Sequence, residues 1–200
     1  MSAAPVVFLD RDGTLIRERE QPPRCAADVE FLAGAVEAVA ELRRAGLALV
    51  MVTNQSAIAR GWLRYEEFEA VQAAVREALA RQGVRLDATY FCPHHPSAGF
   101  APYRRNCECR KPGDALLRRA AQELDLDLAR SWMIGDAVRD LQAGQRVGAR
   151  GILVATGKGE REAARLDPAA RSEVRFAADL RAAASVVLEE LNGARAPQGR

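Results

Sequence analysis

Short runs of apolar residues alternate along the chain with longer segments in which apolar residues recur every three or four positions. The short runs are typical of strands buried on both faces of a parallel sheet, and the longer segments are typical of amphipathic helices. The strands that we expect lie at about 6–9, 47–52, 89–91, 132–134, 151–154 and 174–176. The expected helices lie at about 33–45, 65–81, 114–123, from 138 onward, and 180–191. This alternation predicts an α/β fold with a Rossmann-like parallel sheet and helices on both faces.

Length and composition fit one domain. The 200 residues are 48% hydrophobic, which is enough for a well-filled core. No internal repeat or linker divides the chain, so we expect a single domain over 1–191 and a disordered tail over 192–200. No apolar run approaches the roughly 18 residues that span a bilayer, and residues 1–5 lack the order of a signal peptide. We therefore expect a cytoplasmic monomer without a membrane partner.

The charge balance argues against nucleic acid as a partner. Lys and Arg number 29 against 27 Asp and Glu, for a formal net charge of +2, and the basic residues form no continuous run. A groove for single strands would combine such a run with stacking aromatic residues. Aromatic residues make up only 6% of the chain, so the composition favours a small-molecule partner.

Polar clusters follow three of the predicted strands, and a fourth cluster opens a predicted helix. They are Asp10-Arg11-Asp12-Gly13-Thr14, Thr53-Asn54-Gln55-Ser56, Gly135-Asp136 and, at the helix, Arg110-Lys111-Pro112. In an open parallel sheet, ligands bind at the carboxyl ends of the strands. Any one of these clusters has an alternative interpretation as a turn former. Their coincidence favours one functional site.

The residue types in these clusters suit phosphate chemistry. Asp10 can attack phosphorus as a nucleophile, and Asp12, two residues on, can protonate the leaving group and then activate water. Asp10 and Asp136 can hold magnesium, which takes a few carboxylates and keeps several waters. Thr53 and Lys111 can bind the phosphate oxygens. An idle scaffold is the alternative, but binding alone would not need both aspartates.

These residues resemble the four motifs of the haloacid dehalogenase-like (HAD-like) phosphatases. The matching segments are Phe8 to Leu15, Thr53, Lys111 and Gly135-Asp136. The resemblance implies a HAD-like fold and a magnesium-dependent phosphatase that works through an aspartyl-phosphate. It makes Asp10 the nucleophile and Asp12 the general acid and base, with magnesium held by Asp10, the Asp12 backbone carbonyl and Asp136. Asp140 fits the second acidic position of the fourth motif.

Cysteine and histidine gather in a long aperiodic loop that starts near residue 92. The candidate metal ligands there are Cys92, His94 or His95, Cys107 and Cys109. Three thiolates and one imidazole make a closed tetrahedral site of the structural zinc type. The spacing does not decide between His94 and His95, and unliganded thiols or a redox pair are alternatives. Cys25 stands apart and is expected to be a free thiol.

A wider set of motifs resembles one branch of this superfamily, the heptose bisphosphate phosphatases. The matching segments are 8–15, 52–56, 58–61, 92–96, Cys107 and 109–112. The resemblance implies removal of the 7-phosphate of D-glycero-D-manno-heptose 1,7-bisphosphate, in the synthesis of nucleotide-activated heptose for lipopolysaccharide. It also implies His94 as the zinc ligand. The substrate contacts that it implies are Asn54, Gln55, Ser56 and Arg110, alongside Thr53 and Lys111.

The loop after the first motif departs from that branch. Residues 17–24 lack the expected Gly-Tyr pair, Ala57 stands where Gly is usual, and Ala137 stands where Lys is frequent. Arg17 and Arg19 could hold a second phosphate or could be solvated loop charges. A histidinol-phosphate phosphatase, which shares the zinc loop, and a nucleic-acid 3′-end phosphatase are therefore alternatives. The chain has no room for a large cap domain, so we expect a minimal cap and a small phosphorylated substrate.

Overall fold

All six strands of the sheet run parallel, in the order β3-β2-β1-β4-β5-β6. The computed structural model describes residues 3–195. The strands are β1 (Ala4–Leu9), β2 (Ala48–Asn54), β3 (Ala88–Cys92), β4 (Leu126–Gly135), β5 (Arg150–Val154) and β6 (Arg175–Ala177). Each one contains or overlaps a predicted strand, so the predicted α/β class and parallel sheet are confirmed.

All of the predicted helices are present, and their ends differ from the predicted ends by a few residues at most. The helices are α1 (Ala35–Arg44), α2 (Ser56–Ala59), α3 (Tyr65–Arg81), α4 (Ala115–Leu124), α5 (Val138–Arg146), α6 (Gly159–Arg165), α7 (Pro168–Glu173) and α8 (Leu180–Arg195), with a 3-10 turn at Ala26–Asp28. The sequence pattern missed α2, α6 and α7. They are short, and α7 buries none of its residues, so no apolar periodicity marks it.

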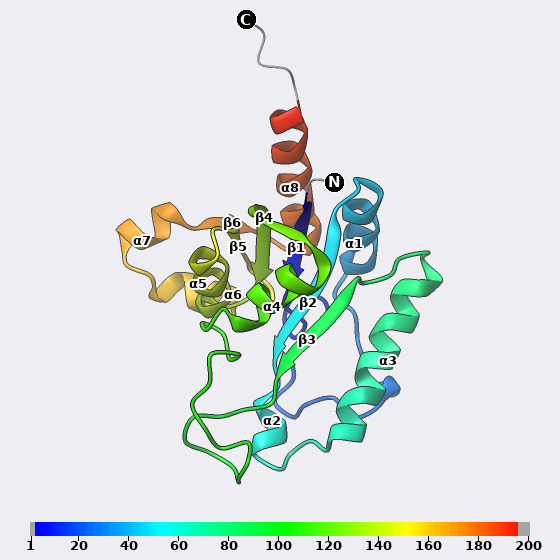
Figure 1. Ribbon diagram of the computed structural model, residues 1–200, viewed down its shortest axis with the longest axis vertical. Coiled ribbons are helices and arrows are strands. Elements are labelled where there is room, and N and C mark those ends of the chain that lie inside the picture. The colour runs from blue at the N-terminus through cyan, green and yellow to red at the C-terminus, as the bar shows by residue number, and fades with distance from the viewer. Residues whose placement is uncertain (1–2, 196–200) are drawn as a thin grey trace, which may run out of the picture.

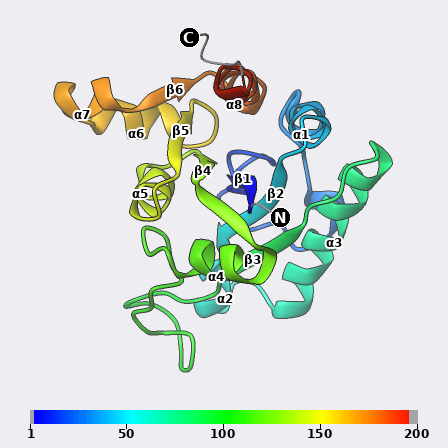
Figure 2. The same ribbon diagram turned by 45° about the horizontal axis from the view of Figure 1, so that its top comes forward.

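The helices form layers on both faces of the sheet. Successive side chains of β1 point to opposite faces, and Val6, Val7, Phe8 and Leu9 are all fully buried. Val7 and Leu9 pack in a cluster with residues of α1, α3 and α8, whereas Val6 and Phe8 pack with residues of α4 and α5. Figure 2 shows α1 and α8 on one side of the sheet and α4 and α5 on the other. Burial on both faces explains why the strand is a continuous apolar run.

Two predicted boundaries are wrong. The strand expected at 132–134 is longer, since β4 begins at Leu126. Its register with β1 shifts between Pro5 and Val7. Residues 126–131 read Leu-Asp-Leu-Ala-Arg-Ser, and their alternation of apolar and polar residues is too short to give a strand signal. Helix α8 continues through Arg195, so 192–195 are helical where a tail was expected. Residues 196–200 lie outside the described residues.

Strand order places several chain segments at one end of the sheet. β1 lies at the centre with β2 on one side and β4 on the other. The chain therefore diverges at the carboxyl end of β1, the place where open α/β sheets bind ligands. Helix α2 and the long loop after β3 project at this end of the sheet (Figure 1). Residues 3–195 contain no helix with the length and hydropathy of a membrane span.

Candidate active site

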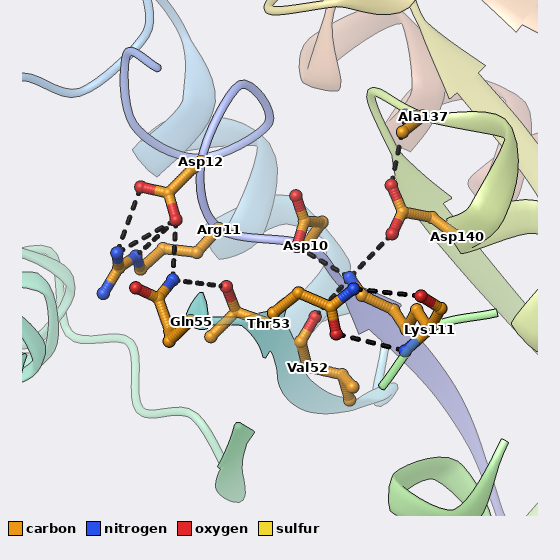
Figure 3. A network of polar contacts seen from close by, with 10 residues as sticks. Asp10, Arg11, Asp12, Val52, Thr53, Gln55, Lys111, Ala137 and Asp140 are labelled. Carbon is orange, nitrogen blue, oxygen red and sulfur yellow. Dashed lines mark hydrogen bonds and ion pairs between the residues drawn. The ribbon is translucent and has the colours of Figure 1, made fainter. Parts of the chain in front are cut away.

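Lys111 joins two aspartates at the carboxyl end of β1. Its ammonium Nζ lies 2.7 Å from Asp10 Oδ1, 2.7 Å from Asp140 Oδ1 and 2.7 Å from the backbone carbonyl oxygen of Val52 (Figure 3). Lys111 is 1% exposed and Asp140 is fully buried. A buried ammonium needs such partners to remain charged, and the two carboxylates do raise the pKa of Lys111 against the effect of burial.

Asp136 completes a cluster of three carboxylates. One oxygen each of Asp10, Asp136 and Asp140 lies within 4.8 Å of the others. Asp136 Oδ2 accepts the Lys158 backbone N–H at 2.9 Å, and Asp136 Oδ1 is buried with no hydrogen-bond partner. Burial, followed by the charge of Asp10, raises the pKa of Asp136 to about 7. A divalent cation would reduce the repulsion among the three carboxylates and would bind the unpaired Asp136 Oδ1, so the donor set fits magnesium.

Two glycines hold the backbone against Asp136. Gly13 has φ +84° and Gly157 has φ +62°, and a Cβ on either would lie 2.2 Å from Asp136 Oδ2. Gly157 belongs to the loop after β5, which no predicted cluster includes. The carboxylate of Asp136 is therefore enclosed by backbone on two sides and has little freedom to move.

Asp12 is held beside the cavity by two neighbours. The Arg11 guanidinium forms a bidentate ion pair with it at 2.9–3.1 Å, and the side-chain amide of Gln55 donates to Asp12 Oδ2 at 2.8 Å. The same Gln55 nitrogen also donates to Thr53 Oγ1 at 2.8 Å. Arg11 is itself buried and bonded to Gln72. Gln55 thus links two predicted site residues, a role that the resemblance did not imply.

Asn54 fixes the backbone of Lys111. Its amide nitrogen donates to the Lys111 carbonyl and its amide oxygen accepts the Lys111 N–H, both at 3.1 Å. The end of β2 is in this way joined to the end of the long loop. Asn54 was expected among the substrate contacts. One N–H and the oxygen of its side-chain amide are already hydrogen-bonded to the Lys111 backbone.

A cavity of about 310 Å³ opens over these residues. The predicted site residues that line it are Asp10, Asp12, Thr53, Asn54, Gln55, Ser56 and Arg110. Lys111 and Asp136 lie deeper and do not line it. Cationic residues absent from the predicted set also line it, among them Arg60, Arg139 and Lys158. Arg60 lies in the matching segment 58–61 but was given no role there, and nothing in the sequence spacing marks Arg139 or Lys158.

The loop that follows the first motif borders the same cavity. Arg19 lines it, whereas Arg17 does not. Both arginines pair with Glu30, at 2.8 Å from Arg17 and 3.6 Å from Arg19, and both are well exposed. Glu18 pairs with Lys158 from the loop after β5. Cys25 is an exposed free thiol, as expected.

Cys92, His94, Cys107 and Cys109 form a second cluster, with the ligand atoms all within 4.8 Å of one another. The sulfur atoms are 3.2–3.6 Å apart, and His94 Nδ1 lies 3.2 Å from Cys109 Sγ. Ligands about 2.3 Å from a tetrahedral zinc ion are about 3.8 Å apart, so the donor set could hold such an ion. Burial lowers the pKa of His94 and so favours the neutral imidazole that a metal needs.

His95 lies outside this cluster. Its Nδ1 accepts the Ala98 backbone N–H at 2.8 Å, and its Nε2 is 2.8 Å from Arg60. Of the two histidines that spacing could not separate, His94 is the one beside the thiols. This is the histidine that the family resemblance implied.

Comparisons with known proteins identify the family. The HAD-hydrolase-like family model matches residues 108–183. The D-glycero-beta-D-manno-heptose-1,7-bisphosphate 7-phosphatase of Photorhabdus laumondii is 44% identical over 77% of this chain and 82% of its own length. The enzyme of the same name from Escherichia coli K12 is 41% identical over 78% and 82%.

Solved structures give the same relationship. The D,D-heptose 1,7-bisphosphate phosphatase of B. bronchiseptica, complexed with magnesium and phosphate, has a TM-score of 0.81 and 34% identity, over 93% of this chain and 99% of that chain. The corresponding Burkholderia thailandensis enzyme has a TM-score of 0.67 and 32% identity, over 92% and 98%. The chain therefore belongs to the D-glycero-beta-D-manno-heptose-1,7-bisphosphate 7-phosphatase family of HAD-like hydrolases.

Proposed function

We propose that this protein removes the 7-phosphate of D-glycero-beta-D-manno-heptose 1,7-bisphosphate, with magnesium, through an aspartyl-phosphate. The observation that carries the proposal is the buried cluster in which Lys111 joins Asp10 to Asp140 and Asp136 stands alongside. This cluster lies beneath a cavity of the right size for a small phosphorylated sugar. Relatives at 41–44% identity bear the name of that activity.

The first half of the reaction transfers the phosphoryl group to the protein. A carboxylate oxygen of Asp10 forms a bond to phosphorus while the bond between phosphorus and the sugar oxygen breaks. Asp12, entering as the carboxylic acid, gives its proton to that oxygen and the sugar leaves as the alcohol. Magnesium, held by Asp10, Asp136 and the Asp12 carbonyl, would reduce the repulsion between the phosphate and the attacking carboxylate.

The second half returns Asp10 to its starting state. Asp12, now a carboxylate, takes a proton from a water molecule, and the water oxygen bonds to phosphorus as the bond to Asp10 breaks. Inorganic phosphate leaves. Gln55 and Arg11 position Asp12 in its carboxylate form, the form that takes the proton from water, because Arg11 contacts both of its oxygens and Gln55 donates to one of them. Asn54 positions Lys111 through the backbone.

We assign a structural zinc ion to Cys92, His94, Cys107 and Cys109. The cluster offers four protein ligands, which leaves no open position for substrate. Its last ligand lies two residues before Lys111, so ordering this loop also orders the lysine. Asn54 completes the connection from the other side.

Turnover of matched substrates tests the proposal. We expect phosphate release from the beta anomer of the heptose bisphosphate to exceed release from the alpha anomer, histidinol phosphate and a 3′-phosphorylated oligonucleotide. Asp10→Asn should abolish release while leaving the melting temperature in magnesium-free buffer close to that of the wild type. Preference for histidinol phosphate would refute the proposed substrate but would leave the proposed aspartyl-phosphate chemistry intact. Normal turnover by Asp10→Asn would overturn the aspartyl-phosphate.

A further inference from the structure

Arg139 lies beside the catalytic carboxylates but belongs to none of the motifs. It sits in the first turn of α5, three residues after Asp136, and its side chain lines the same cavity as Asp10 and Asp12. Burial opposes a charge there, yet the carboxylates of Asp140, Asp10 and Asp136 raise the pKa of Arg139. The guanidinium therefore stays a cation at the wall of the cavity.

This guanidinium has no partner among the described residues. Its Nε is buried and makes no hydrogen bond, and none of the salt bridges found within residues 3–195 includes it. Other arginines of the site differ in this respect. Arg11 is bound to Asp12 and Gln72, and Arg110 donates to the His94 carbonyl. A buried donor that the protein leaves unpaired is a donor available to a ligand.

Lys111, by contrast, is already largely engaged with the protein. Its Nζ donates to Asp10 Oδ1 and to the Val52 carbonyl oxygen, both at 2.7 Å, and forms an ion pair with Asp140 at 2.7 Å. An ammonium group carries three N–H bonds, so these two hydrogen bonds leave Lys111 one further donor. The phosphoryl group that arrives at Asp10 has three oxygens, so donors from a second cationic side chain would add to that one.

We propose that Arg139 binds the phosphoryl group that is transferred to Asp10, through the paired N–H donors of its guanidinium. The inference rests on the proposed phosphatase function. A planar fork of donors matches two phosphate oxygens at once, and its charge compensates the dianion. Arg139 thus adds hydrogen bonds to those that Thr53 and Lys111 can give, while Lys111 also holds the nucleophile in place.

Kinetics of Arg139→Gln and Arg139→Lys test this role, with Arg146→Gln as the matched control on the same helix, where Arg146 is exposed. The substrates are the heptose bisphosphate and p-nitrophenyl phosphate, which has one phosphate and no sugar. We expect Arg139→Gln to lower kcat/KM about 100-fold or more for both, Arg139→Lys to lower it about 10-fold, and Arg146→Gln to change it less than twofold.

Binding of inorganic phosphate, measured by calorimetry in saturating magnesium, gives a second readout. We expect Arg139→Gln to weaken phosphate binding at least 10-fold while the Kd for magnesium alone changes less than threefold. A loss of kcat/KM for the heptose bisphosphate but not for p-nitrophenyl phosphate would overturn the inference, because Arg139 would then bind the second phosphate of the bisphosphate. Unchanged phosphate binding with an altered magnesium Kd would also overturn it and make Arg139 a counterion to the carboxylates.

These measurements separate the inference from the function on which it rests. If the wild type hydrolyses no sugar phosphate but binds phosphate in an Arg139-dependent way, the proposed function fails and the inference stands. If the wild type is an active heptose bisphosphatase and Arg139→Gln is fully active, the inference alone fails.

Discussion

Gly157→Ala changes a residue that no sequence motif identifies, yet it should disturb the magnesium site. Gly157 has φ +62°, and an added Cβ would lie 2.2 Å from Asp136 Oδ2 and 2.6 Å from the Gly13 Cα. The Gly13 Cα is backbone, and the Asp136 carboxylate is the end of a short, buried side chain. Asp136 is enclosed on its other side by Gly13, so the carboxylate must turn away from its present position or the loop after β5 must move.

The expected cost has two parts. A left-handed backbone conformation costs a residue other than glycine about 1–2 kcal/mol. Forcing an extra methyl group into a packed site adds about 1–3 kcal/mol. The free energy of unfolding should therefore fall by about 2–5 kcal/mol. Displacement of one carboxylate ligand should also weaken magnesium binding by about 10- to 100-fold, which is about 1.4–3 kcal/mol.

Gly148→Ala separates the two parts. Gly148 has φ +82°, and a Cβ added there meets nothing within 4 Å. We expect it to lose about 1–2 kcal/mol from the backbone alone and to bind magnesium as the wild type does. Urea denaturation gives both stabilities, and calorimetric titration gives the affinities. If Gly157→Ala keeps the wild-type magnesium affinity and loses no more stability than Gly148→Ala, the close approach around Asp136 has no functional consequence.

Three further results are expected. Asp136 has a pKa of about 7 in the folded metal-free protein, against 3.8 in the unfolded chain. Its protonation therefore stabilises the fold in full below about pH 4, and this contribution is lost as the pH rises to 7. Magnesium must displace this proton, so the affinity measured by titration should rise about tenfold per unit from pH 5 to 7 and then level off; an affinity that is flat over this range would contradict the coupling. Gln55→Leu should lower kcat about 10-fold with little change in KM, because Asp12 and Thr53 each lose a hydrogen bond; an unchanged kcat would show that Arg11 alone suffices. Cys109→Ser should reduce bound zinc measured by elemental analysis, increase proteolysis of the loop after β3 and lower kcat, whereas Cys25→Ser should change none of these; full activity in zinc-free protein would separate the loop from catalysis.

The sequence predicted the sheet and the positions of the strand-end clusters because these depend on short-range patterns. Apolar runs give the strands, and a polar cluster after each run gives the site edge. The pairing of side chains within the site was not predictable in this way. The sequence pattern could not indicate that Lys111 contacts Asp140 and the Val52 carbonyl, because these groups meet it only through packing of α5 and β2.

Asn54 and Gln55 illustrate the same limit. Family resemblance placed both among the substrate contacts, and both do line the cavity. Their amides also bind Lys111 and Asp12, which depends on rotamers that only the folded surroundings select. Arg139 and Gly157 had no signal of their own, since one is an ordinary residue of an amphipathic helix and the other a loop glycine.

The pairing of β1 has a consequence for the order in which the protein can fold. The carboxyl-terminal half of β1 pairs with Trp132, Met133 and Ile134 of β4, more than a hundred residues later in synthesis. The face of β1 that carries Val7 and Leu9 also packs in one cluster with α8, through Ala183, Ala184 and Val187. A ribosome-bound chain thus carries an apolar strand with one open edge until β4 emerges, and loop closure over that distance delays the pairing. Asp10 precedes Lys111, Asp136 and Asp140 in the chain, so it reaches its working position only after these later partners have been made.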